Sequence, residues 1–164
     1  MVYDHIAKLR SAMPNIALRT TFIVGYPGES ADDFAATLDL IREIGFAQAF
    51  SFKYSARPGT PAAAAVDQIP EAVKDERLAR LQALLRAQQD AFAAAQVGRT
   101  LPVLLERRGR HRGQLIGRSP YLQAVHLAAP AGAIGTVVPV AIAAAGPNSL
   151  AGRMLADAPE RIAV

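Results

Sequence analysis

Apolar positions near the start of the sequence change from helical to strand spacing. In residues 2–13 they recur every three or four positions and stop before Pro14, which predicts a helix. Residues 16–24, IALRTTFIV, are instead a nearly continuous β-rich run. This run leads into the turn sequence GYPGE at residues 25–29. The pattern therefore predicts a helix followed by a strand that ends in a glycine-rich turn.

A second strand follows after another helix. Ser30 stands where a helix N-cap is expected, and the amphipathic run behind it stops at Gly45, which predicts a helix over residues 31–44. Residues 49–55, AFSFKYS, then alternate apolar and polar side chains and end in a second turn, RPGTP. This order predicts parallel strands joined by a right-handed crossover. Two strands are too few to close a sheet, so we expect a small open α/β layer or part of a larger one.

The pattern changes in the second half of the chain. A long helix is predicted over residues 70–96, with Pro70 at its first position, as a connection between two modules. Beyond it, short β-rich pieces such as TLPVLLE and GQLIGRS recur between glycines at hairpin-like intervals, which predicts a small antiparallel β-barrel. Pro102 and Pro139 would then lie at edges or bulges, because proline donates no hydrogen bond to a sheet.

These patterns divide the chain into four parts. They are an α/β layer (1–69), a connecting helix (70–96), a β-barrel (97–155) and a tail without a clear pattern (156–164). No run approaches the ~18 uncharged apolar residues that a membrane span requires. No basic-then-apolar secretion signal opens the sequence. We therefore expect a cytoplasmic protein with no membrane partner.

Composition narrows the possible chemistry. The 164 residues include no cysteine, which excludes disulfides, thiolate catalysis and any iron–sulfur site built by this chain alone. Residues 97–164 hold eight arginines against three acidic residues, a net charge of +5, although the whole chain carries only +4. Arginine suits bidentate contacts with phosphate, so this excess favours a polyanion partner. A merely solvated basic surface is the alternative.

One arginine-rich segment lies within the predicted barrel. Arg107, Arg108, Arg110 and Arg112 belong to ERRGRHRG, which has the pattern of a glycine-containing hairpin loop. Such loops on small β-barrels are common nucleic-acid contacts. Aromatic residues for base stacking are scarce here, with Tyr121 alone in the region, which favours contacts to backbone and shape.

The turn at residues 25–29 allows two interpretations. Ligands gather at the carboxyl ends of parallel strands, where the glycines would admit a ligand and Glu29 could accept a hydrogen bond from it. Alternatively, glycine and proline simply make the turn. The same choice applies to Phe52 and Tyr54, which could flank a planar ring or belong to the core. Three scattered histidines give no metal-ligand spacing.

Five longer motifs resemble a known family. TTFIVGYPGE, AFSFKYSARPGTPA, VGRTLPVLLE, GQLIGRSPYLQAVH and GPNSLAG, in this order and spacing, closely resemble the C-terminal half of radical-SAM methylthiotransferases. The similarity runs to about Met154. FSFKYSARPGTPA and NSLAG look most like the tRNA-modifying branch, which makes 2-methylthio-isopentenyladenosine. Arg19, Thr20 and Thr21 are also similar to a sister branch that modifies a ribosomal-protein aspartate.

The resemblance implies a fold and a set of sites. The fold would be the last part of a radical-SAM (β/α) barrel, a connecting helix and a small OB-like β-barrel, the TRAM domain, that binds the tRNA anticodon stem-loop. The wall of the S-adenosylmethionine site would include Ile23, Gly25, Phe52 and Tyr54. The candidates for RNA contact are Arg107, Arg108, Arg110, Arg112, Arg118 and Asn148.

The sequence departs from the family at one decisive point. The intact enzymes use S-adenosylmethionine and two 4Fe-4S clusters held by cysteines, and this chain has none. We therefore expect a fragment that lacks the N-terminal part of the same enzyme, has no metal or catalytic residue of its own and is inactive alone. The alternatives are the ribosomal-protein branch and a stand-alone RNA-binding module without catalysis.

Overall fold

The computed structural model describes residues 2–155, and the expected tail at 156–164 lies outside them. The chain divides into two compact units, Met1–Gln89 and Asp90–Val164. Within residues 2–155, no helix combines the length and apolar character needed to cross a membrane.

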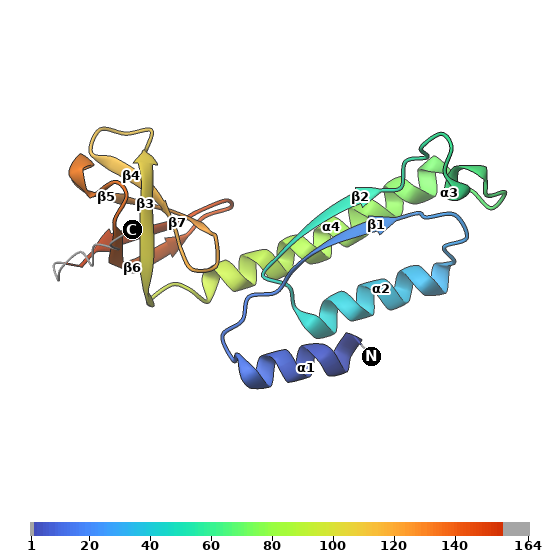
Figure 1. Ribbon diagram of the computed structural model, residues 1–164, viewed down its shortest axis with the longest axis horizontal. Coiled ribbons are helices and arrows are strands. Elements are labelled where there is room, and N and C mark those ends of the chain that lie inside the picture. The colour runs from blue at the N-terminus through green and yellow to red at the C-terminus, as the bar shows by residue number, and fades with distance from the viewer. Residues whose placement is uncertain (1, 156–164) are drawn as a thin grey trace. The chain divides into compact units, whose positions relative to one another are not determined.

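The first unit alternates helices and strands (Figure 1). Its elements are α1 (Val2–Ala12), β1 (Arg19–Val24), α2 (Ala31–Ile44), β2 (Gln48–Lys53), the short α3 (Pro61–Ala64) and α4 (Glu71–Ala94), which continues into the second unit. β1 and β2 pair in parallel, as predicted, and Ile23 lies opposite Phe52. Pro70 precedes α4 instead of opening it, because its carbonyl accepts the Lys74 N–H at 3.1 Å in the manner of an N-cap.

Both ends of α2 are fixed by the residues that predicted them. The Ser30 hydroxyl accepts a hydrogen bond from the Asp33 N–H, and the Asp33 carboxylate accepts one from the Ser30 N–H, a complete capping box. Hydrogen bonds from the Ser30 hydroxyl and then from its N–H hold the pKa of the Asp33 carboxyl below its usual value. At the other end Gly45 adopts a left-handed conformation (φ 63°) and donates its N–H to Ile41.

The two faces of the β1–β2 sheet differ in character. One face is covered: Val24 is fully buried in a cluster with apolar residues of α2 and with Leu81 and Leu85 of α4. Alternate side chains point the other way, where Ile23, Phe50 and Phe52 are 59%, 52% and 55% exposed. The unit therefore presents an uncovered apolar face.

The second unit contains a closed barrel of five strands (Figure 1). The strands are β3 (Thr100–Arg108), β4 (Gln114–Arg118), β5 (Ala124–Ala128), β6 (Val137–Ala145) and β7 (Leu150–Met154), with the 3-10 turn η1 (Ala131–Ala133) before β6. Around the barrel their order is β3-β4-β5-β7-β6, and β6 returns to β3. The predicted small barrel is confirmed, and it is OB-like.

One pair of strands corrects the prediction of an antiparallel barrel. β7 lies between β5 and β6, and it runs parallel to β5, with Val125 opposite Leu150. The other four pairs in the barrel are antiparallel. The sequence did not indicate this arrangement, because β7 is only LAGRM and its glycine interrupts the apolar alternation.

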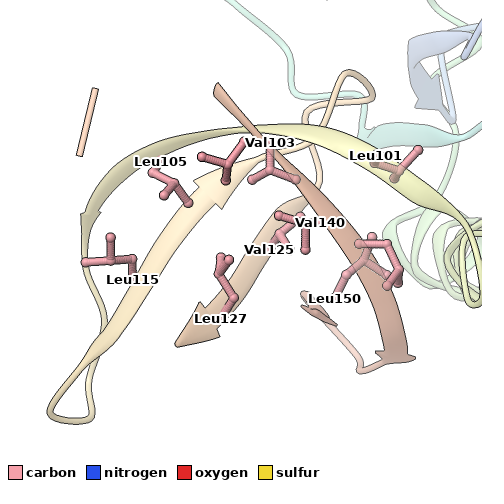
Figure 2. Packing of buried hydrophobic residues seen from close by; sticks show 10 residues of the cluster. Leu101, Val103, Leu105, Leu115, Val125, Leu127, Val140 and Leu150 are labelled. Carbon is pink, nitrogen blue, oxygen red and sulfur yellow. The ribbon is translucent and has the colours of Figure 1, made fainter. Parts of the chain in front are cut away.

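The barrel interior is filled by alternate residues of its strands (Figure 2). Figure 2 shows these side chains converging from all five strands, and the set includes Leu101, Val103, Leu105, Leu115, Val125, Leu127, Val140 and Leu150. Gly117 faces the same interior at a point of close approach. A Cβ placed there would lie 2.3 Å from the carbonyl oxygen of Leu104, so no larger residue fits without a backbone shift.

The two barrel prolines lie directly opposite each other, in β3 and β6. Neither lies at a bulge, but each lies outside the pairs that its strand makes on the other side, which begin at Leu104 for β3–β4 and at Val140 for β6–β7. Backbone hydrogen bonds join Arg99 to Ile142 at one end of the β3–β6 ladder and Leu105 to Thr136 at the other end. Because hydrogen-bonded and non-hydrogen-bonded pairs alternate in an antiparallel ladder, every second pair between these two ends is hydrogen-bonded. Pro102 and Pro139 fall on a pair that is not. Their missing N–H groups therefore cost the β3–β6 ladder no hydrogen bond.

Candidate functional site

The glycine-rich turn between β1 and α2 is closed by the chain itself. The Gly25 N–H donates to the Glu29 carboxylate at 2.7 Å, and the Gly28 N–H donates to the Asp67 carbonyl at 3.0 Å. Both glycines have positive φ, 73° and 81°. A Cβ on Gly25 would lie 2.4 Å from Cγ of Lys74. The space that these two glycines leave is therefore filled by Lys74 and Asp67 of the same chain, which favours the interpretation in which they make the turn.

The Glu29 side chain is also bound by a residue of this chain. Its carboxylate lies 2.5 Å from the Arg77 guanidinium, which bonds the Glu29 carbonyl as well, at 2.9 Å. The two side chains are only 12% and 10% exposed. Of the two interpretations of the turn, this favours the one in which its residues serve the turn itself, because the Glu29 carboxylate is already neutralised in an ion pair with Arg77.

Two buried cations of α4, Lys74 and Arg77, hold this turn, and neither was predicted from the sequence. Lys74 crosses Gly25 and Arg77 binds Glu29, and both are buried on the face of α4 that also carries Leu81 and Leu85. The Lys74 ammonium bonds Glu71 at 2.9 Å. Hydrogen bonds from Lys74 and then Lys53 lower the pKa of the Glu71 carboxyl. α4 is therefore more than a connection, since its first turns clamp the loop after β1.

The four residues expected at the cofactor wall form two adjacent pairs. Ile23 and Phe52 are register partners on the uncovered face of the sheet. Gly25 and Tyr54 lie just beyond the strand ends, and both contact Lys74, whose ammonium lies 5.5 Å from the centre of the Tyr54 ring. The Tyr54 hydroxyl is buried and has no hydrogen-bond partner. The arrangement therefore offers an exposed apolar surface from Ile23 and Phe52, and beyond the strand ends a buried tyrosine hydroxyl without a partner.

The arginine-rich segment forms the β3–β4 hairpin and its loop. Arg107 and Arg108 end β3, whereas Arg110 and Arg112 lie in the loop, and all four are exposed. The loop is fixed by Gln114, whose carbonyl oxygen accepts the Gly109 N–H at 2.7 Å. Residues 107–112, the arginine loop, therefore present four cations at one ordered end of the barrel.

Arg118 and Asn148 lie toward the other end. β4 runs away from the arginine loop and ends at Arg118, which pairs with Ala124 at the start of β5. Asn148 lies in the β6–β7 loop, just before Leu150, which pairs with Val125. The predicted RNA-contact residues are therefore split between the two ends of the barrel.

A row of side chains on the outer barrel face joins these ends. Arg107, Ile116, His126 and Ala151 are register partners on β3, β4, β5 and β7 in turn. The His126 ring nitrogen Nδ1 lies 3.3 Å from the hydroxyl of Ser149, the neighbour of Asn148. In OB-like barrels, this face and the two flanking loops form the usual surface for oligonucleotides. In the sequence His126 is one of three scattered histidines, with no local sign of a role on this face.

Beside this face lies an open groove with apolar walls. Its walls come from Pro102 and Leu104 of β3, Val137 of β6, and Pro120 and Leu122 of the β4–β5 loop. One polar pair, Glu106 and Arg118, also lines it, with Arg118 Nε 3.3 Å from the Glu106 carboxylate.

Tyr121, the aromatic residue of the barrel sequence, packs against other side chains of the protein. Tyr121 packs edge-to-face on Phe92, with 5.4 Å between ring centres, and the Arg99 guanidinium lies 5.8 Å from its centre. The Tyr121 hydroxyl also accepts a hydrogen bond from Arg99 at 3.3 Å. Tyr121 is half-buried in these contacts and is not presented for base stacking.

The described residues offer no place for a metal centre. Among residues 2–155 no three histidine, cysteine, aspartate or glutamate side chains gather closely enough to hold a metal ion. The full sequence also contains no cysteine. Iron–sulfur clusters need thiolate ligands, so this chain does not fit one by itself.

Comparison with known proteins assigns the barrel. The family described as TRAM domain matches residues 94–155, which are the barrel together with the end of α4. Residues 94–155 form a TRAM domain. The TRAM domain thus contains all six residues that the sequence analysis named for RNA contact.

The similarity extends beyond the TRAM domain. The chain is 61% identical over 145 residues to the tRNA-2-methylthio-N(6)-dimethylallyladenosine synthase of Sphingopyxis alaskensis. The aligned part covers 88% of this chain and 33% of the relative, so the chain spans about a third of that protein's length. The resemblance to tRNA methylthiotransferases that the sequence motifs indicated is therefore confirmed.

Proposed function

We propose that this chain is the tRNA-binding part of a cytoplasmic methylthiotransferase that acts on isopentenyladenosine beside the anticodon. The observation that carries the proposal is the outer face of the TRAM domain. There the Arg107–His126 row links the β3–β4 hairpin, which carries four arginines, to the loop of Asn148. The name of the Sphingopyxis relative, a tRNA-modifying synthase, supports tRNA over a ribosomal protein as the substrate.

The proposal divides the RNA contacts by role. The arginine loop would bind phosphates, because exposed guanidinium groups give strong contacts that do not depend on sequence. Arg118 and Asn148 would contact the RNA at the far end of the same face. The partner would be the anticodon stem-loop, whose backbone can follow such a face.

The first unit would contribute a wall of the cofactor site. Ile23 and Phe52 form an exposed apolar surface that fits one face of a flat adenine ring. Gly25 and Tyr54 would border that surface. Bound S-adenosylmethionine supplies the adenosyl and methyl groups of the reaction, and cleaving it requires clusters that this chain does not hold.

RNA binding can be tested by fluorescence anisotropy of a labelled anticodon stem-loop at several salt concentrations. We expect the logarithm of affinity to fall linearly with the logarithm of salt concentration. Replacing Arg107, Arg108, Arg110 and Arg112 by serine should reduce that slope by about 3 and weaken low-salt binding about 100-fold. The matched control replaces four exposed arginines of the first unit, Arg42, Arg57, Arg80 and Arg86. Equal losses in both variants, or wild-type binding insensitive to salt, would contradict the proposal.

The absence of cluster ligands gives a second expected result. The purified chain, incubated with S-adenosylmethionine and a strong reductant, should release no 5′-deoxyadenosine, because no thiolate is present to hold the electron-donating cluster. The measurement is chromatography of the quenched reaction against a boiled control. Release above that control would show that this chain starts the radical reaction alone.

A further inference from the structure

The groove beside the β3–β4 ladder is well suited to a single unstacked nucleobase. Its walls are aliphatic, and two of their leucines are notably open to solvent, Leu104 at 39% and Leu122 at 51% exposed. Bases that leave a stack can be held on apolar or planar side chains and read through their polar edges. The groove combines such walls with one polar pair.

The polar pair offers a base both kinds of hydrogen-bonding group. Arg118 Nε donates to Glu106 and its Nη1 donates to the Leu122 carbonyl at 3.2 Å, which fixes the guanidinium plane. The pair remains accessible, with the Arg118 side chain 51% and the Glu106 side chain 38% exposed. A carboxylate that accepts and a guanidinium that donates, side by side, match the donor and acceptor groups of a base edge.

The charges at the groove favour a base over a phosphate as its occupant. Glu106 and Arg118 cancel, so the groove itself is neutral and its carboxylate would repel a phosphate. The nearest cations for phosphates are Arg107 and Arg108, which directly follow Glu106 in β3, and Arg110 and Arg112 lie in the turn beyond them. An RNA chain that runs from those arginines along β3 would reach the neutral groove.

The backbone at Leu122 supports a role for this loop. Leu122 is the one residue other than glycine among residues 2–155 with positive φ, at 61°. A leucine in this conformation is strained, and such strain is concentrated at binding sites. The turn is held by the buried Ser119, whose carbonyl accepts the Leu122 N–H at 2.9 Å. The strained turn keeps the Leu122 side chain at the groove.

We propose that this groove binds one unpaired nucleobase of the RNA held by the arginine loop, with Leu104 and Leu122 contacting the ring and Glu106 and Arg118 its edge. The proposal rests on RNA binding by the TRAM domain and adds where a base is recognised. It predicts that unpaired RNA and duplex RNA differ in how they use the groove.

The test compares Leu122→Asn with Ile134→Asn in the full chain. Asparagine tolerates positive φ, so the change removes the apolar contact without adding strain. Ile134 is a similarly exposed apolar residue of the same unit outside the groove. Leu122→Asn should weaken binding of a hairpin RNA with an unpaired loop about fivefold. Leu122→Asn should change the affinity for a blunt duplex with the same number of phosphates less than about twofold. Ile134→Asn should change the affinity for either RNA less than about twofold.

A second arm replaces loop nucleotides one at a time by abasic ones. One abasic position should weaken hairpin binding by the wild-type protein about fivefold, as Leu122→Asn does. The same abasic position should not weaken binding by the Leu122→Asn variant any further. Glu106→Gln should weaken hairpin binding if the carboxylate faces a base, whereas it should strengthen binding if a phosphate lies there.

The outcomes separate this proposal from the one on which it rests. Salt-dependent RNA binding that is unaffected by Leu122→Asn and by every abasic position would overturn the base site while leaving RNA binding intact. Stronger hairpin binding by Glu106→Gln would also overturn it. So would a Leu122→Asn variant that keeps its RNA affinity but forms fewer dimers than wild type, because the groove would then bind a second copy of the chain. Absence of salt-dependent binding in the wild-type chain would overturn both proposals.

Discussion

Replacing Arg77 by methionine is expected to destabilise the first unit by about 3 kcal/mol, because the Glu29 carboxylate stays buried without its counter-charge. Methionine retains the apolar stem over Phe34, whose ring centre lies 5.5 Å from the guanidinium carbon. Adding Glu29→Gln should recover most of the loss, since the neutral amide oxygen can still accept the Gly25 N–H. Hydrogen exchange of peptides from α2, read by mass spectrometry, reports on this unit separately.

Arg80 provides the matched control for that experiment. It lies one turn further along α4 and also faces the Phe34 ring, at 5.2 Å, but its ion pair with Glu76 is exposed. Arg80→Met should therefore change stability by less than about 0.5 kcal/mol. If Arg77→Met and Arg80→Met behaved alike, the buried ion pair would not be what holds the glycine turn to α4.

Replacing Gly117 by alanine is expected to destabilise the barrel by about 3 kcal/mol, because the new methyl group meets backbone that cannot move aside alone. Its Cβ would lie 2.3 Å from the Leu104 carbonyl oxygen and 2.7 Å from Cγ1 of Val103. Faster hydrogen exchange of β3 and β4 peptides would measure the effect. Gly132→Ala is the control, since nothing lies within 4 Å of its Cβ position, and it should be neutral or slightly stabilising. A stable Gly117→Ala barrel would mean that β3 and β4 can separate at this point.

Local signals in the sequence were sufficient for most of the elements. Ser30 and Gly45 predicted the ends of α2 because a cap hydrogen bond and a left-handed turn each require a particular residue type. The barrel strands β3 to β6 followed from apolar alternation between glycine turns. These features depend on near neighbours in the chain, so a sequence shows them directly.

Features that depend on distant partners could not be predicted. Arg77 is a charged residue on a helix, for which a solvent-facing position is expected, and its partner Glu29 lies 48 residues away. The parallel pairing of β5 with β7 likewise joins Val125 to Leu150 with no local sign. The predicted RNA-contact residues are a similar case, because only the strand register shows that Arg118 at the end of β4 and Asn148 before β7 lie away from the turn that carries Arg110 and Arg112.

The position of β7 has a consequence for how the protein is made. Because β7 separates β5 from β6, a nascent chain cannot close its barrel until residues 150–154 have left the ribosome. The pairing of β5 with β7 also brings together segments about 25 positions apart, which slows the final step relative to forming a hairpin. The barrel therefore becomes able to close only after β7 has been made, and premature termination before Leu150 yields a polypeptide without a closed barrel.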